Sequence, residues 1–554
     1  MKSRVIKPHL ANLLLFFVIT FFISFIEAED RRLNPPNGSW GMVKAQPSGN
    51  GLNRQDPVAT SPGTVPQAVT YLTCRIDRIS PQNRTLAVSC ATALPAEKFQ
   101  LRFADQFAGV DRLSERVYGL KIKDDKGVVL PLEIRGDGLY RLDVKGRRRI
   151  TIEYEMRLAR ALDPSQYALV SSLGDEAGFL MLGDLLPRLC PDHVGDADCD
   201  GFVNQEQLQI ITPQSWQIAT TEKRGAEFFE ISDPRRAVFF LGRLREKTVA
   251  VGAMNLRIAI TGAWSFADED VFKLAEAVAR EQAAIVGGAS AADSLITLAP
   301  FPQPLTGLRS SAVTIGRTSA LMLNPNNDAV ATFAHYRRHL AHEMFHFYLP
   351  NAFRVRENFD WFWEGFTRYI ALITLTRLQL IGLREYLDAI GVEYEAYWFN
   401  PLRNQVSLIE ASPEKFSSAA SYDLIYRKGM LVAALYDLEL RWQSGGKRNL
   451  ADVMRSLYQR HATGGRAIGN REVLDEMRGV GDFSRLFSGL FSDLIRDDIE
   501  TSREIVLNKR INRYGLMMEW SAAGRGKARL KTAAKLSARQ RMLLSELARK
   551  PVRP

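Results

Sequence analysis

Two histidines and a glutamate lie close together in the stretch AHEMFHFYLP, residues 341–350. On a helix, His342 and His346 are one turn apart on the same face, so both imidazoles could bind one metal ion. Zinc suits these donors, because it binds neutral imidazole nitrogens and keeps a fourth position for water in catalytic sites. Glu343 adjoins a ligand but faces away from the pair, where it could take a proton from that water.

A five-residue pattern of this kind also occurs by chance, but four of the chain's seven histidines fall on the same predicted helix. His335, His339, His342 and His346 are spaced by four, three and four residues. At about 100° per residue they follow one stripe, which is unusual for an ordinary solvated face. His339 could orient a ligand or line the pocket.

Glu364 is the candidate for a third ligand. It stands in FDWFWEGFTRYI, an apolar stretch that predicts a buried helix. A carboxylate buried there needs a cation, and a metal ion is one such partner, whereas an unrelated salt bridge is the alternative. Seventeen residues separate His346 from Glu364. That length allows one helix to end near Pro350 and a second helix to turn back.

These motifs resemble a known family. HEMFH followed by WFWEGFTRYI resembles the gluzincin metallopeptidases, and WxxEGFTxY is similar to the bacterial glycyl aminopeptidase family. SYDLIYRKGMLVAALYDLELR and NLADVMRSLYQRH resemble the helical part of that family's catalytic domain, so the resemblance covers about residues 256–495. It implies that His342, His346 and Glu364 bind zinc and that Glu343 is the general base. The PDZ domain of many relatives is not expected here.

The resemblance also implies a role for Tyr426, which stands in the sequence YRKG. Its hydroxyl would stabilise the negative charge that develops on the carbonyl oxygen during peptide hydrolysis. Position alone does not select this residue, because Tyr422 lies one turn earlier on the same face. A tyrosine that only joins two helices is the alternative.

One stretch departs from the aminopeptidase pattern. Aminopeptidases of this clan bind the free amino terminus of the substrate through a carboxylate on the strand before the zinc helix. Thr306–Leu323 contains no acidic residue, and Arg309 would repel an amine. Within it, Ala312–Leu323 is expected to be an edge strand that could pair with an extended peptide. Terminal and internal cleavage therefore both stay open.

The whole chain of 554 residues, with 46% apolar and 24% charged residues, predicts a globular protein of several domains. The expected class is multidomain α+β, with an N-terminal antiparallel β domain, a thermolysin-like zinc catalytic domain and a C-terminal helical domain. The expected segments are a signal peptide or anchor (1–28), a flexible leader (29–66), a β-rich domain (67–265), the catalytic domain (266–380), the helical domain (381–510) and a basic tail (511–554).

The first 28 residues predict export. Basic residues precede the uncharged run 10–26, and small Ala28 offers a cleavage point. Because the run is barely long enough to span a bilayer, an uncleaved anchor is the alternative. The protein is thus expected to be periplasmic or secreted, or anchored to the membrane. The net charge of +11 comes from this segment and the basic tail. The tail is expected to be solvated or to contact an anionic membrane. No specific nucleic acid is expected as a partner.

All four cysteines lie in the β-rich domain. Export permits oxidation, so we expect disulfides between Cys74 and Cys90 and between Cys190 and Cys199. Other pairings remain possible, and a zinc site made of the four cysteines is a further alternative.

GDADCDGFVNQEQ resembles the first half of a calcium loop. Asp196, Asp198 and Asp200 alternate as calcium ligands would, and Gly201 allows the sharp turn. The position that should close the shell with an acid is Gln207, so a plain acidic surface loop is the alternative.

Together these features predict an exported zinc metallopeptidase that hydrolyses a peptide or protein substrate with a zinc-activated water and a glutamate base. One alternative is a non-catalytic protein that binds peptides or assembles with partners on the same scaffold. Another is a zinc hydrolase of non-peptide substrates.

Overall fold

The computed structural model describes residues 71–93, 98–144, 149–158, 162–191, 205–288, 292–325, 328–462, 465–481, 490–520 and 527–547. The predicted signal peptide or anchor and the leader lie outside these ranges, and so does the predicted calcium loop with Asp196, Asp198 and Asp200. Among the described helices, none has the length and apolar character of a membrane span.

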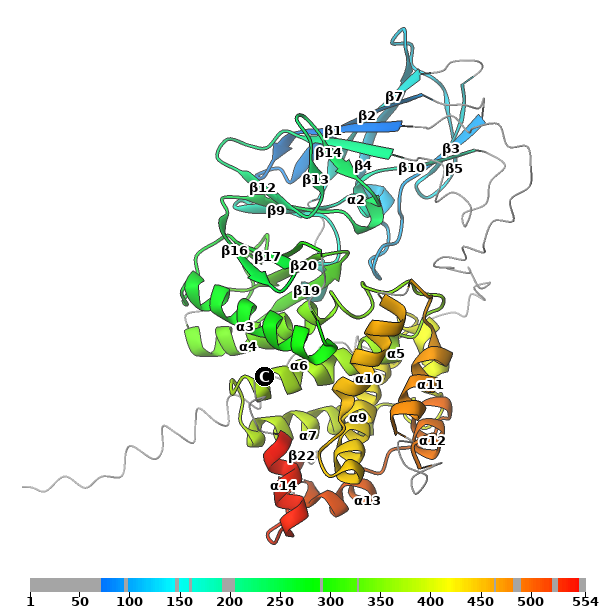
Figure 1. Ribbon diagram of the computed structural model, residues 1–554. Helices are drawn as coiled ribbons and strands as arrows, with labels where there is room; N and C mark the ends of the chain where they lie inside the picture. The colour runs from blue at the N-terminus through cyan, green and yellow to red at the C-terminus, as the bar shows by residue number, and fades with distance from the viewer. Residues whose placement is uncertain are drawn as a thin grey trace, which may run out of the picture. The chain divides into compact units, whose positions relative to one another are not determined.

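Strands dominate the N-terminal part, as the short apolar runs predict (Figure 1). The largest sheet consists of β1 (Tyr71–Ser80), β2 (Thr85–Ala93), β4 (Val117–Asp124), β7 (Arg149–Arg157), β11 (Gln205–Ile210), β13 (Lys223–Arg224) and β14 (Phe229–Ile231). Their order is β13-β14-β11-β1-β2-β7-β4. The pairs are antiparallel except β1 with β11, which is parallel. In β7 alternate residues are buried, from Ile150 to Met156, so one face of this sheet covers the core.

Two smaller sheets complete the described strands of this part. Their strands are β3 (Lys98–Arg102), β5 (Leu132–Gly136), β6 (Leu139–Asp143), β8 (Ser172–Leu173), β9 (Ala177–Met181), β10 (Arg188–Pro191), β12 (Gln217–Thr220) and β15 (Val238–Gly242). Their orders are β10-β3-β6-β5 and β12-β15-β9-β8. The expected antiparallel β domain is confirmed, apart from the parallel pair in the large sheet.

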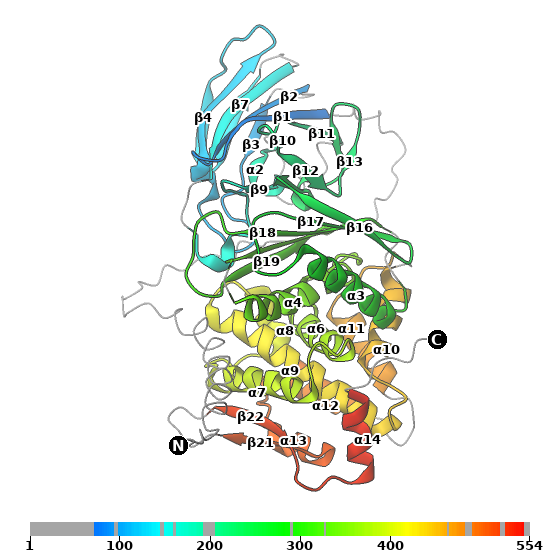
Figure 2. The ribbon, with the colours of Figure 1, turned by 90° about the vertical axis from the view of Figure 1, so that its left-hand side faces the viewer.

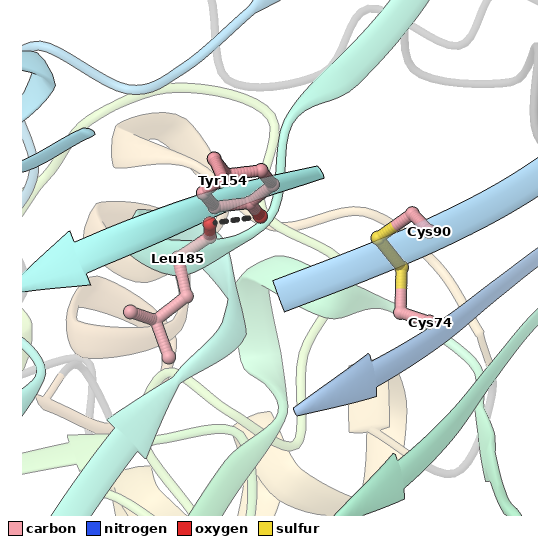
Figure 3. The surroundings of a disulfide bond; sticks show 4 residues. All are labelled: Cys74, Cys90, Tyr154 and Leu185. Atoms are coloured by element: carbon pink, nitrogen blue, oxygen red, sulfur yellow. Dashed lines mark hydrogen bonds between the residues drawn. A yellow bond between two sulfur atoms is a disulfide. The ribbon is translucent and has the colours of Figure 1, made fainter. Parts of the chain in front are cut away.

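The predicted disulfide between Cys74 and Cys90 is confirmed (Figure 3). The two residues lie directly opposite each other on β1 and β2, with their Cα atoms 4.0 Å apart. Close by, the Tyr154 hydroxyl donates a hydrogen bond of 2.8 Å to the Leu185 carbonyl. Cys190 is also disulfide-bonded, but its expected partner Cys199 lies outside the described residues. Disulfides are typical of compartments outside the cytoplasm.

A five-stranded sheet follows, with the order β16-β17-β18-β20-β19. Its strands are β16 (Arg245–Val251), β17 (Met254–Ile260), β18 (Ser294–Pro300), β19 (Ser310–Ile315) and β20 (Thr318–Leu323). β17 pairs in parallel with β18, so this sheet joins two strands from the predicted β-rich segment 67–265 to three strands from the predicted catalytic segment 266–380. The expected single strand Ala312–Leu323 is instead a hairpin that turns at Gly316, where φ is +57°. The edge strand is β19.

Helices α3 (Asp268–Val286) and α4 (Ala329–Phe345) pack against this sheet, α3 at β16 and β17 and α4 at β19 and β20 (Figure 2). The α4 helix begins where the Asp328 carboxylate caps the backbone N–H of Ala331. Its buried residues Tyr336, Leu340 and Met344 follow a helical period and face the core. The histidine stripe thus lies on a helix, as predicted.

Two glycines let the next helices approach closely. The chain continues with α5 (Asp360–Trp363) and α6 (Gly365–Arg377). α6 packs against α9 (Ala419–Ser444). A Cβ atom added at Gly365 would lie 2.5 Å from the Gly429 Cα atom, closer than real contacts allow. The glycines of the sequences EGF and RKG therefore bring Glu364 and Tyr426, which stand close to them, towards one site.

The C-terminal part is helical, as predicted. Its other described helices are α7 (Leu383–Phe399), α8 (Leu408–Ala411), α10 (Leu450–Leu457), α11 (Asn470–Gly481), α12 (Leu490–Ile495), α13 (Leu507–Ile511) and α14 (Ala538–Leu547). The expectation of a solvated basic tail is wrong for most of its length. β21 (Leu516–Trp520) and β22 (Ala528–Thr532) form a hairpin, and β22 packs on α7. Leu543, Leu544 and Leu547 of α14 are buried, so apolar residues between the charges anchor this segment.

Candidate metal centre

The structure brings His342, His346 and Glu364 together, although Glu364 lies far from α4 in sequence, at the junction of α5 and α6. The Nε2 atoms of the two histidines are 3.2 Å apart. Glu364 Oε2 lies 3.3 Å from Nε2 of His342 and 3.5 Å from Nε2 of His346. In the described part of the chain, this group of three could hold a metal ion.

The distances fit zinc. In a tetrahedral site with bonds of about 2.0–2.1 Å, two ligand atoms lie about 3.3 Å apart. The three measured separations, 3.2, 3.3 and 3.5 Å, are close to that value. On His346 the other ring nitrogen, Nδ1, lies 2.8 Å from the Leu349 carbonyl, which fixes the ring and would leave Nε2 available to a metal ion. Glu364 Oε2 is buried and forms no regular hydrogen bond with the described residues, as expected of a metal ligand.

A buried lysine supports the carboxylate ligand. Lys415 Nζ donates to Glu364 Oε1 at 2.7 Å and contacts Asp360 Oδ1 at 3.3 Å. Its side chain is 9% exposed and that of Glu364 is 11% exposed. Burial alone would raise the pKa of Glu364, but Lys415 and the two imidazoles outweigh it and hold that pKa well below its usual value. Glu364 is therefore ionised and ready to bind a cation.

The charge of Glu364 also acts on His346. Burial favours the neutral ring, but the contact with Glu364 outweighs it and raises the pKa of His346 to about 9. A metal ion must displace this proton, because only the neutral ring coordinates it.

Glu343 lies on the same helix beside the two imidazoles and is 6% exposed. The Thr314 hydroxyl of the edge strand β19 lies 2.9 Å from Glu343 Oε2 and 2.8 Å from the Glu343 backbone carbonyl. This contact holds the carboxylate beside β19, the last strand of the sheet.

Tyr426 lies next to the centre, as the resemblance implies. Its ring is half-buried and stacks near His342, with centroids 6.4 Å apart. Tyr422 stacks on the outer side of Tyr426 at 4.5 Å and is 41% exposed. Of the two tyrosines, only Tyr426 has a ring contact with His342 among the described residues. Burial and then the charge of Glu364 raise the pKa of Tyr426 well above its usual value, so it keeps its proton.

Sequence reasoning missed three groups at this site: Lys415, Thr314 and Ser310. Ser310 Oγ lies 2.9 Å from His339 Nε2 and 2.8 Å from His335 Nε2. The contacts of all three residues span at least 25 positions. The sequence could have indicated only Ser310 and Thr314, because alternate residues of β19 face α4.

No protein-family model and no curated protein sequence matches the chain. In structure it is similar to an aminopeptidase N family protein from Idiomarina loihiensis, with 18% sequence identity and a TM-score of 0.67 over 84% of this chain and 82% of that one. An M1 zinc metallopeptidase from Deinococcus radiodurans shows 14% identity and a TM-score of 0.48 over 79% of this chain and 94% of that one. A mutant M1 zinc metallopeptidase from that organism, bound to a Tyr-Ser-Ala substrate, shows 12% identity and a TM-score of 0.45 over 79% and 94%.

The first of these likenesses establishes the fold, which is that of the aminopeptidase N family protein. It agrees with the resemblance to the gluzincins, because the structure places two histidines at the C-terminal end of α4 and a glutamate from the junction of α5 and α6 around one point. The fold and the donor set are consistent with that resemblance.

Proposed function

We propose that this protein is a zinc-dependent metallopeptidase. The observation that carries the proposal is the meeting of His342, His346 and Glu364, whose ligand atoms all lie within 4.8 Å of one another on this fold. A binding protein that had lost catalysis would have no chemical need to keep Glu343 and Tyr426 beside such a group. For this reason hydrolysis is favoured over binding alone.

Each residue of the centre has a part in the proposed reaction. A zinc ion bound by His342, His346 and Glu364 would act as a Lewis acid and would lower the pKa of its water to about 7. Glu343 takes the proton from that water and delivers it to the leaving amine. Tyr426, protonated, donates its hydroxyl to the carbonyl oxygen as negative charge develops there.

The proposed substrate is a peptide that adds to the free edge of β19. Extended peptides commonly bind such edges by main-chain hydrogen bonds. Thr314 on this strand contacts Glu343, so a peptide paired with β19 would pass the base. The absence of acids from Thr306–Leu323 removes the expected partner of a free amine, and we therefore propose no requirement for a free amino terminus.

The proposed location is outside the cytoplasm, in the periplasm or the medium. The disulfide between Cys74 and Cys90 supports this location, since thiols stay reduced in most cytoplasms. The N-terminal pattern of the sequence supports export by a signal peptide.

The test is hydrolysis of a mixed peptide library by the purified protein, before and after removal of metal with a chelator. Activity that disappears with chelation and returns with stoichiometric zinc supports the proposal. His342→Ala should abolish both zinc binding and cleavage, and His461→Ala, which changes a histidine far from the centre in sequence, should change neither. Cleavage that continues without metal would refute the proposal.

A further inference from the structure

One cluster beside the metal centre has no part in the reaction proposed above. It consists of Ser310, His335 and His339 and is called the Ser310 cluster. Both imidazoles point Nε2 at the same hydroxyl, at 2.8 and 2.9 Å. The two rings touch edge to face, with centroids 4.6 Å apart. All three residues are partly exposed.

The hydrogen bonds of the cluster leave one donor free. A neutral imidazole carries one N–H and one lone pair. With both Nε2 atoms at Ser310 Oγ, one ring donates to this oxygen and the hydroxyl donates to the other ring. That second ring keeps its proton on Nδ1, for which the described residues offer no partner.

The surroundings of the cluster are cationic. Burial and, after it, the charge of Arg338 lower the pKa of His335 to about 4. Burial, then the neighbouring His335 and His342 rings, and after them Arg368 and Arg338 lower the pKa of His339 well below its usual value. Both rings are therefore neutral at pH 7, although they lie at a partly open surface. A nearby carboxylate would have the opposite effect, and the cluster contains none.

Arg338 is the cation of this surface, and Glu385 and Glu393 act on its charge only from a distance. It is exposed, and within the described residues it forms no ion pair. The nearest acids serve other arginines: Glu393 binds Arg368 at 2.7 Å and Arg427 at 2.9 Å. Glu385 lies 3.7 Å from Arg337. A divalent cation would be repelled here, whereas an anion would find a guanidinium and a free N–H.

The cluster lies along the path proposed for the substrate. Ser310 and Thr314 are on the same face of β19, and the strand runs in the same direction as α4, from the Ser310 cluster to Glu343. A peptide that pairs antiparallel with β19 would have its C-terminal end at Ser310. The cluster would then face residues that follow the bond to be cut.

We propose that the Ser310 cluster and Arg338 form a subsite for a carboxylate of the substrate, on the C-terminal side of the bond that is cut. The inference rests on the proposed function, and it names the substrate class as acidic in this part. Two sources have the same chemistry: the free C-terminus of a short peptide, or an Asp or Glu side chain of a longer one.

The experiment measures binding, in the zinc-loaded Glu343→Gln background, which stops hydrolysis under the proposed function. Four fluorescein-labelled pentapeptides serve as probes. One pair is pentaalanine with a free C-terminal acid and with a C-terminal amide. The other pair is the amide with Glu and with Gln at its fourth position. Fluorescence anisotropy gives the affinity of each probe. Charged hydrogen bonds of this kind predict that one acidic probe binds about 10- to 100-fold more tightly than its neutral match.

Variants assign the preference to the subsite. Arg338→Gln should remove most of the preference, and Arg338→Lys should retain part of it. Arg280→Gln makes the same charge change on α3, where Arg280 pairs with Glu276, and should leave the preference intact. The free acid and the Glu probe tell the two sources apart. Equal binding of acidic and neutral probes, or an equal loss for both in Arg338→Gln, would overturn the inference. A preference without any hydrolysis by the wild-type chain would instead refute the proposed function.

Discussion

Replacing Lys415 with methionine tests how the buried charges around the metal centre balance. The change keeps most of the side-chain volume and removes the ammonium that contacts Glu364 at 2.7 Å and Asp360 at 3.3 Å. Both carboxylates stay behind in a site where the Lys415 and Glu364 side chains are about one-tenth exposed. Breaking such a buried ion pair typically costs about 3–5 kcal/mol of stability. In the metal-free protein we expect a loss of that size.

Zinc should reduce this loss, since its charge faces the same carboxylate through Glu364 Oε2. The free energy of unfolding of wild type and Lys415→Met should therefore differ less with zinc than without it. Urea unfolding followed by tryptophan fluorescence, with and without zinc, measures both differences. Lys428→Met is the matched control, because Lys428 is also buried and its ammonium contacts the Thr501 carbonyl at 3.4 Å.

The control should have the same effect on stability in both metal states. A loss in Lys415→Met that is equal or larger in the zinc-loaded protein would refute the charge balance described here. It would mean that the lysine serves mainly to orient Glu364 for the metal, as outer-shell partners often do.

Three further predictions concern other parts of the molecule. Tyr426→Phe should lower kcat by about 10²–10³ with zinc content unchanged, whereas Tyr422→Phe should change it little, and comparable losses would contradict the assignment. Replacing both Cys74 and Cys90 with serine should lower the free energy of unfolding by about 3 kcal/mol, because the disulfide closes a loop of 16 residues. Denaturant titration measures this loss. The zinc affinity should not change, as competition with a chelator would show. Burial and then Asp233 raise the pKa of Glu206 to about 7, above its value in the unfolded chain. Stability should therefore fall as the pH rises from the unfolded pKa to the folded one. Glu206→Gln should stabilise the protein at pH 8 but little at pH 5.

The metal centre could be predicted from sequence because its geometry is mostly local. Helical spacing alone puts His342 and His346 on one face, and the apolar surroundings of Glu364 demand a partner. The supporting groups could not be predicted. Lys415 and Glu364 are 51 positions apart, Glu364 directly before α6 and Lys415 shortly before α9, and no pattern near either residue indicates the other.

The sequence predicted which parts of the chain form strands and which form helices. Alternating runs identified the N-terminal strands, and helical periods identified the C-terminal helices. The sequence could not predict to which sheet β17 belongs. Its alternating apolar residues fit a strand of either the N-terminal sheets or the five-stranded sheet, and only its parallel pairing with β18 decides between them. The tail was misjudged because its positive charge dominates the composition, whereas three spaced leucines, Leu543, Leu544 and Leu547, decide its packing.

The most direct test of the central claim is the rate of peptide hydrolysis by zinc-loaded Glu343→Gln relative to wild type. The glutamine keeps the shape of the side chain and loses only the ability to take a proton, and removing a general base typically costs about 10²–10⁴ in rate. We predict a loss of this size with one zinc ion still bound per chain. A variant that binds zinc fully and cleaves peptides at the wild-type rate would contradict the account.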